Sequence, residues 1–255
     1  MKSKILTGAL IAMMSFSVFA CGEPNASSLG NLEDVAVQGD CIQYDYDELK
    51  AEAKVIAKVE VMDDLTEANS HLTYDEQLEH PAVSDFYATR KVKLIDVYKT
   101  SLELPDNGEI EIIERTAVAD GQYLHVEGYS AMEKGQTYLV FLSDETASGE
   151  LSVISRNNGI FDISKLNKAQ GENEYYDIGV KALVEFESDL PEAEKQKILS
   201  AQVIKLPENK GEQDQMEHTE EIVVGEAQKN SKISYKLHYG ETADGQTVIA
   251  DLQKQ

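Results

Sequence analysis

The sequence predicts a mainly β protein with some α structure (α+β). We expect a bulged β-barrel lobe over about 41–166 and a smaller α+β lobe over about 175–255 that ends in a β-hairpin. Three observations predict this class. Many short segments alternate apolar and polar residues, as half-buried strands do. The alternation slips phase inside two of them, which is typical of the β-bulges that bend strands in small barrels. The polar stretch Asn167–Tyr176 separates two different patterns.

The first lobe opens with a helix and a strand. Asp47–Ala53 places acidic residues ahead of strong helix formers, which favours a short helix. Lys54–Met62 alternates apolar and charged residues, which indicates a strand with one solvated face. Asp63–Pro81 is long, acidic and irregular, so we expect a loop there.

The other strands of this lobe are separated by turn signals such as Pro105–Gly108 and Asp120–Gly121. The two phase slips fall at Leu94–Ile95 and at Ile112–Ile113, where we expect bulges. The predicted strands are Phe86–Tyr98, Glu109–Val118, Gln122–Glu127, Thr137–Leu142 and Leu151–Ser155, with Gly159–Ile163 trailing.

The second lobe mixes helix and strand signals. Val180–Phe186 alternates like a strand, and Glu192–Ser200 follows a proline that suits the first turn of a helix. Gln202–Leu206 is expected as a short strand and Pro207–Glu220 as a charged linker. Ser231–Leu252 contains two alternating segments around a glycine-containing turn, which predicts a β-hairpin.

Residues 1–20 have the layout of an export signal. Lys2 and Lys4 precede Ile5–Phe19, a run without charge that consists almost wholly of apolar and small residues. A run of about 15 residues is too short to span a bilayer core of ~30 Å. We therefore expect a signal peptide rather than a transmembrane helix.

The segment ends in Val18, Phe19, Ala20 and Cys21. This resembles the lipobox of bacterial lipoproteins, with low-GC Gram-positive bacteria as the nearest likeness and a Gram-negative source left open. The resemblance implies cleavage between Ala20 and Cys21, acylation of the Cys21 thiol with palmitate-type chains, and an extracytoplasmic, membrane-anchored protein. Phe19 departs from the small residue usual there. Val18-x-Ala20 also fits ordinary signal cleavage, so secretion stays open. We expect Cys21–Asp40 to form a flexible tether.

The chain is strongly acidic, with 47 acidic against 23 basic side chains and a net charge of -24. This balance argues against nucleic-acid binding, which needs clustered Lys and Arg. Loss of Lys2 and Lys4 with the signal leaves 21 basic against 47 acidic side chains, or -26, a charge that opposes approach to anionic lipid. Solubility outside the cell explains the charge most simply, and low-affinity binding of divalent cations is the alternative.

No motif assigns a catalytic residue, a cofactor or a metal. A solvated acidic loop is the simplest interpretation of the nearest approach to a metal cluster, which comprises His71, Asp75, Glu76, Glu79 and His80. His125 and His238 fall on polar strand faces, and His218 lies apart from all of them. Ser130 lacks the second glycine of a nucleophile elbow. Cys41, beside Asp40, has no basic neighbour to activate it, so we expect an unpaired, small apolar residue.

The first lobe resembles OB-type barrels of the netrin-like sort found in extracytoplasmic modules. The resemblance rests on the acidic helix Asp47–Ala53 leading into Val55–Val61, then Phe86–Tyr98 closed by Lys99, then Tyr138–Leu142. It implies an OB-like barrel and covers about half of the chain that remains after cleavage. Netrin-like protease inhibitors act through a free N-terminal Cys and a disulfide-tied barrel. Here Cys21 is expected to be acylated, so that activity does not carry over.

The sequence thus favours a lipoprotein held to the cell membrane through Cys21, acting as a non-enzymatic binding or interaction module for an envelope protein or polymer. Two alternatives stay open. One is a hydrolase whose site is assembled from scattered acids and histidines. The other is cation binding by the acidic surface.

Overall fold

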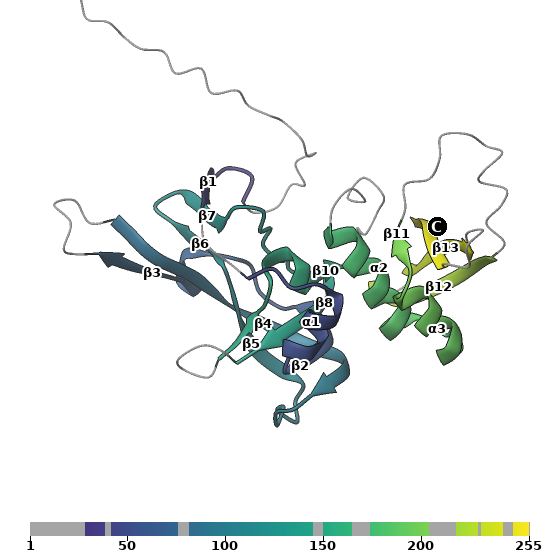
Figure 1. Ribbon diagram of the computed structural model, residues 1–255. Helices are drawn as coiled ribbons and strands as arrows, with labels where there is room; N and C mark the ends of the chain where they lie inside the picture. Colours follow the sequence, from purple (N-terminus) through teal and green to yellow (C-terminus); the bar gives the residue numbers. More distant parts are fainter. Residues whose placement is uncertain are drawn as a thin grey trace, which may run out of the picture.

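The computed structural model describes residues 29–38, 42–75, 82–144, 150–164, 174–203, 218–228, 231–241 and 247–254 (Figure 1). The described chain is mainly β, with a closed five-stranded barrel and three α-helices. The predicted fold class, an α+β protein with an OB-like barrel, is therefore confirmed. The signal peptide, Ala20, Cys21 and Cys41 lie outside the described residues.

The barrel closes in the order β8-β2-β4-β5-β9 and back to β8. Neighbours run antiparallel except β5 and β9, which are parallel, as in a Greek-key barrel of OB type. Inward-facing aliphatic residues such as Val59, Val92, Ile112 and Val140 fill its interior. The strands are β2 (Val55–Val61), β4 (Ala82–Thr100), β5 (Glu109–Glu114), β8 (Thr137–Ser143) and β9 (Leu151–Val153), and β10 (Ile160–Asp162) extends the sheet beside β8.

The bulges lie on β4. Its pairing with β2 skips Ile95 and Tyr98, so the bulge expected at Leu94–Ile95 is confirmed. The bulge expected at Ile112–Ile113 is wrong, because β4 and β5 pair in unbroken register there. Both isoleucines are buried, and this two-sided burial imitates a phase slip in the sequence. The single strand expected over Glu109–Val118 also divides, at Arg115, into β5 and β6 (Thr116–Ala119).

A small three-stranded sheet packs beside the barrel. It has the order β1-β7-β6, with β1 (Glu33–Val37) parallel to β7 (Gln122–Val126). Phe86 of β4 and Leu124 of β7 lie in the buried cluster beneath it, with Leu72 packed against them. Residues Glu33–Val37, which lie within the flexible tether predicted for Cys21–Asp40, therefore form a strand.

The loop predicted for Asp63–Pro81 is also wrong in part. It contains the short helix η1 (Glu67–Asn69) and β3 (Ser70–Asp75), which pairs with the first half of β4. Within the described residues β3 pairs only with β4, and none of its residues is fully buried. Its sequence therefore lacks the apolar alternation that would mark a strand.

The C-terminal part contains α2 (Glu174–Glu187) and α3 (Glu192–Leu199) with a four-stranded sheet. The predicted α3 and the hairpin are confirmed, whereas the strand predicted at Val180–Phe186 is wrong, because these residues belong to α2. The predicted linker was wrong at His218–Glu220, which begins β12. The sheet order is β11 (Gln202–Val203), β14 (Thr247–Lys254), β13 (Ser231–Glu241) and β12 (His218–Gln228).

One buried cluster joins the barrel side to the C-terminal part. It includes Leu49 of α1 (Tyr46–Glu52), Phe141 of β8, Val184 of α2, Ile198 of α3 and Tyr235 of β13. Figure 1 shows α2 between the barrel and the C-terminal sheet, with α3 beside α2 and below that sheet. The proposed boundary near 166–175 falls mostly outside the described residues and stays a prediction.

Candidate functional site

The candidate site is a groove on the outer face of β4 and β5. Val92 and Ile110 are register partners whose side chains are buried in the barrel. Because strand side chains alternate between faces, their neighbours point outward. The outward pairs are Lys91 with Glu111 and Lys93 with Glu109.

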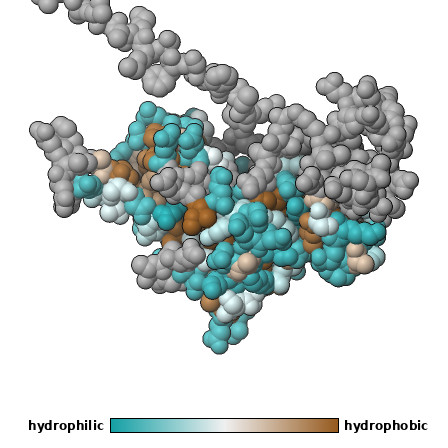
Figure 2. All heavy atoms as spheres, viewed as in Figure 1, coloured by the Kyte–Doolittle hydropathy of each residue, from teal (hydrophilic) through white to brown (hydrophobic). Residues whose placement is uncertain are grey.

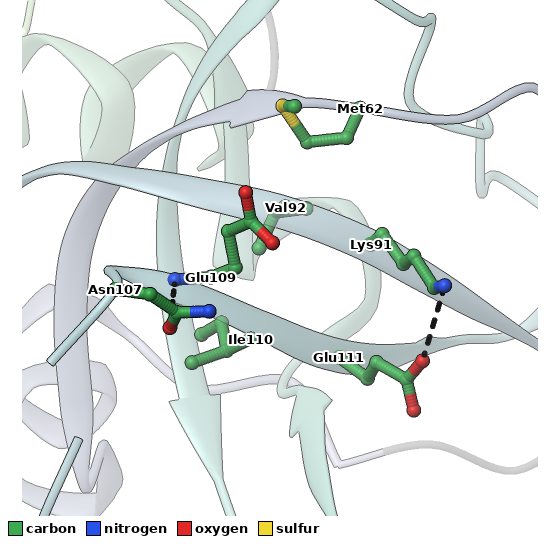
Figure 3. A pocket seen from close by; sticks show the side chains of 7 residues that line it. All are labelled: Met62, Lys91, Val92, Asn107, Glu109, Ile110 and Glu111. Atoms are coloured by element: carbon green, nitrogen blue, oxygen red, sulfur yellow. Dashed lines mark hydrogen bonds and ion pairs between the residues drawn. The ribbon is translucent and has the colours of Figure 1, made fainter. Parts of the chain in front are cut away.

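The groove has a volume of about 330 Å³ (Figure 3). Met62, which follows β2, forms one wall, and Asn107 lies at the turn that leads into β5. The turn requires Gly108, whose φ of 69° is in the left-handed region. Gly108 also accepts a 2.7 Å hydrogen bond from the Leu94 amide, which ties the turn to β4. The lining residues are Met62, Lys91, Val92, Asn107, Glu109, Ile110 and Glu111.

Most polar side chains of the groove have a partner within the described residues, but the Glu109 carboxylate has none. Lys91 Nζ lies 4.0 Å from Glu111 Oε1, and both side chains are exposed. Asn107 Oδ1 accepts the Glu109 amide at 3.1 Å. Figure 3 shows the Glu109 carboxylate extending across β4 toward Met62. Within the described chain this carboxylate forms neither an ion pair nor a hydrogen bond, so it is available to a cationic group.

A second polar cluster is sealed inside the protein. Arg90 of β4 and Glu114 of β5 are both fully buried, with Arg90 Nη1 2.6 Å from Glu114 Oε2. Glu114 Oε1 also accepts hydrogen bonds from the Tyr129 hydroxyl and the Met132 amide, each at 2.9 Å. Arg90 donates further to Asp63 Oδ1 at 3.2 Å and to the Asp63 carbonyl at 2.8 Å. This cluster connects four chain segments.

Burial raises the pKa of Glu114, while the Arg90 guanidinium and the two hydrogen bonds oppose that rise. Burial also raises the pKa of the Tyr129 hydroxyl well above its usual value, and the neighbouring Glu114 adds to the effect. None of these groups lines the groove. The cluster therefore holds the fold together rather than presenting reactive groups to a ligand.

The end of α2 binds α1 and the barrel through two carboxylates that flank one aromatic ring. Glu185 accepts the Tyr46 hydroxyl and the Lys50 ammonium, each at 2.7 Å. Glu187 accepts Lys58 Nζ at 2.9 Å and also the Tyr98 hydroxyl. Phe186 between them stacks on Tyr98, with ring centroids 5.0 Å apart. Burial, followed by these hydrogen bonds, raises the pKa of both tyrosines.

The structure disperses the histidines that sequence analysis considered. His71 stacks on Tyr87 at 4.6 Å, and its Nε2 lies 3.3 Å from the Thr89 hydroxyl. His125 lies on β7 with its Nε2 2.9 Å from Asp34 Oδ1. Ser130 is exposed in the segment after β7, and His80 lies outside the described residues. His218 and His238 belong to β12 and β13.

Among the described residues, no three His, Cys, Asp or Glu side chains are grouped as metal ligands. No helix in the same ranges is long and apolar enough to cross a bilayer. Sequence reasoning missed the groove. Its one available signal was the Pro-Asp-Asn-Gly turn followed by alternating charged and apolar residues at Glu109–Glu111.

Comparison with known proteins adds no assignment. No protein-family model matches the chain, and no curated protein matches it significantly. The class is therefore defined by fold and site alone: an OB-like barrel with an open, charged groove on its outer face.

Proposed function

We propose that this protein is an extracytoplasmic lipoprotein, anchored through Cys21, that binds an envelope protein or polymer at the β4–β5 groove. Its likeness to netrin-like modules belongs to the same proposal. The anchor rests on the lipobox residues Val18, Ala20 and Cys21. Two acyl chains supply stable membrane attachment, which the acidic surface of the body cannot provide.

The observation that carries the binding function is the separation of the groove from the buried charges. Acid–base catalysis needs titratable groups with shifted pKa values inside a cleft. Here the shifted carboxyl, Glu114, is enclosed by its own partners, whereas the groove is open and lined by exposed charges. This arrangement suits recognition better than proton transfer.

The position of the groove supports the same proposal. In chain order, β4 and β5 are the second and third of the five barrel strands. In OB-type barrels this is the face that commonly binds ligands. Figure 2 shows hydrophilic residues over most of the visible described surface, with hydrophobic patches between them.

The anchor is tested with Cys21→Ser, and Cys41→Ser serves as the control. We expect Cys21→Ser to leave the membrane fraction, or to accumulate as precursor, while Cys41→Ser stays at the membrane. Mass spectrometry of the mature wild-type chain should show an added diacylglyceryl group. A chain that lacks lipid and has lost two hydrogens would instead indicate a secreted protein with a Cys21–Cys41 disulfide.

The groove is tested by placing a photocross-linking residue at Lys91 in cells, with Glu52 on the exposed face of α1 as the control position. A discrete adduct from position 91 that is absent from position 52 is the expected result. Equal labelling from both positions, or none from position 91, would contradict a binding role for this face.

A further inference from the structure

We infer that the β4–β5 groove accepts the lysine or arginine side chain of a basic, extended polypeptide segment. This inference rests on the proposed function, because it identifies the partner chemistry of the same groove. It starts from Glu109, whose exposed carboxylate extends toward Met62 and pairs with no charged group in the described chain.

The opposite wall suits the stem of such a side chain. Met62 is 41% exposed, so its side chain offers apolar surface to a ligand in the groove. Lys and Arg place their methylene stems along apolar surface while their charged ends stay in polar surroundings. A stem packed against the Met62 thioether would bring its cationic end to the Glu109 carboxylate on the facing side.

The lysines of the sheet do not already fill this role. Lys91 lies 4.0 Å from Glu111, which is the nearest acidic partner the structure gives it. Lys93 is the register partner of Glu109, yet it forms no ion pair with it within the described residues. These two lysines and two glutamates cancel in formal charge, so the groove supplies a specific position for a cation rather than a strong local electric field.

The long-range attraction comes from the whole molecule. A net charge of -24 raises the local concentration of cationic partners and speeds their encounter, in a manner that salt screens. The same field repels acidic peptides and nucleic acids. The charge of the whole molecule therefore speeds the association of a basic segment, and the Glu109 carboxylate then holds its cationic group in the groove.

The test uses the full-length protein and two synthetic peptides: acetyl-Gly-Lys-Gly-Lys-Gly-Lys-Gly amide and its glutamate counterpart. Affinity is measured by NMR titration at low and at physiological salt. We expect the lysine peptide to bind and the glutamate peptide not to bind. The chemical-shift changes on binding should centre on Met62, Asn107 and Glu109. Raised salt should weaken its binding. No binding of the lysine peptide at low salt would overturn the inference.

The decisive comparison is Glu109→Gln against Glu52→Gln, since both remove one exposed carboxylate and change net charge equally. Glu109→Gln should weaken lysine-peptide binding about threefold or more, the scale of one exposed ion pair, while Glu52→Gln leaves it nearly unchanged. Equal effects of the two variants would mean that net charge alone attracts the peptide, which also overturns the inference. If the Lys91 cross-link still forms in cells, the binding function survives that failure.

Discussion

At the scale of single residues, the buried pair of Arg90 and Glu114 is highly sensitive to substitution. Arg90 and Glu114 have no contact with water, and their separation of 24 positions gives no local sequence signal. Each is satisfied by the other and by neighbouring polar groups. A buried pair of this kind costs desolvation, so its net contribution is small while both members are present. Removal of one member is a different matter, because the other charge stays buried.

We therefore expect Glu114→Gln to destabilise the protein by about 3 kcal/mol, the lower end of the range for a broken buried pair, since the buried Arg90 charge would keep only the partly exposed Asp63 carboxylate, at 3.2 Å, as its counterion. Glu111→Gln on the exposed face of the same strand should cost about 1 kcal/mol or less. Urea denaturation of both variants measures the difference. Similar losses in the two would show that the buried pair contributes no more than the exposed one.

At the scale of elements, sequence analysis succeeded where a strand has one buried and one solvated face. The barrel part of β4 has this pattern, and in β13 the alternate residues Tyr235, Leu237 and Tyr239 are buried. The strand β2 was also predicted from its alternation, but the solvated face expected for it is wrong, because Lys58 is buried along with its apolar neighbours. It failed for α2, because the apolar residues at every second position of Val180–Phe186 imitate a strand, whereas the structure buries most residues of Ile178–Val184 within a helix. It failed for β1 and β3 because both are short edge strands with exposed side chains. The groove depends on the register between β4 and β5, and the Pro105–Gly108 turn indicates only that these strands are neighbours.

The contact between α2 and the barrel gives a prediction at this scale. Glu187→Ala removes the acceptor of Lys58, which is buried, and of the Tyr98 hydroxyl, which is partly buried. Loss of hydrogen bonds to a charged group should cost about 2–3 kcal/mol. Glu52→Ala, at an exposed site on α1, should change little. Thermal unfolding of the two variants checks this, and an unchanged midpoint for Glu187→Ala would show that the aromatic contact of Phe186 suffices alone.

At the scale of the whole molecule, the tyrosines predict loss of stability in alkali. Burial raises the pKa of Tyr46, Tyr98, Tyr123, Tyr129 and Tyr138 above the ordinary value of 10.0. The folded state thus favours the neutral hydroxyl. The stability that this contributes is complete below pH 10 and falls as pH rises above 10, because the unfolded chain ionises first.

Absorbance at 295 nm should therefore show only part of the 12 tyrosines titrating near pH 10 in the native protein. The rest should ionise together with unfolding, while the urea-unfolded chain should titrate in a single step near 10. A native titration that matches the urea-unfolded one would contradict the burial of these hydroxyls.

The last prediction concerns the number of unfolding units. The polar break Asn167–Tyr176 suggests two lobes, but the buried cluster that contains Leu49, Val184, Ile198 and Tyr235 receives residues from both sides of that break. Neither side could separate without exposing that apolar surface to water. We therefore expect one cooperative transition, with amide exchange in β5 and β13 reporting the same free energy of opening. Leu49→Ala and Ile198→Ala, each removing a fully buried side chain, should lower both values together by about 2–5 kcal/mol. If Ile198→Ala loosened β13 and left β5 unchanged, the lobes would unfold separately, and limited proteolysis near the polar break should then release a folded barrel.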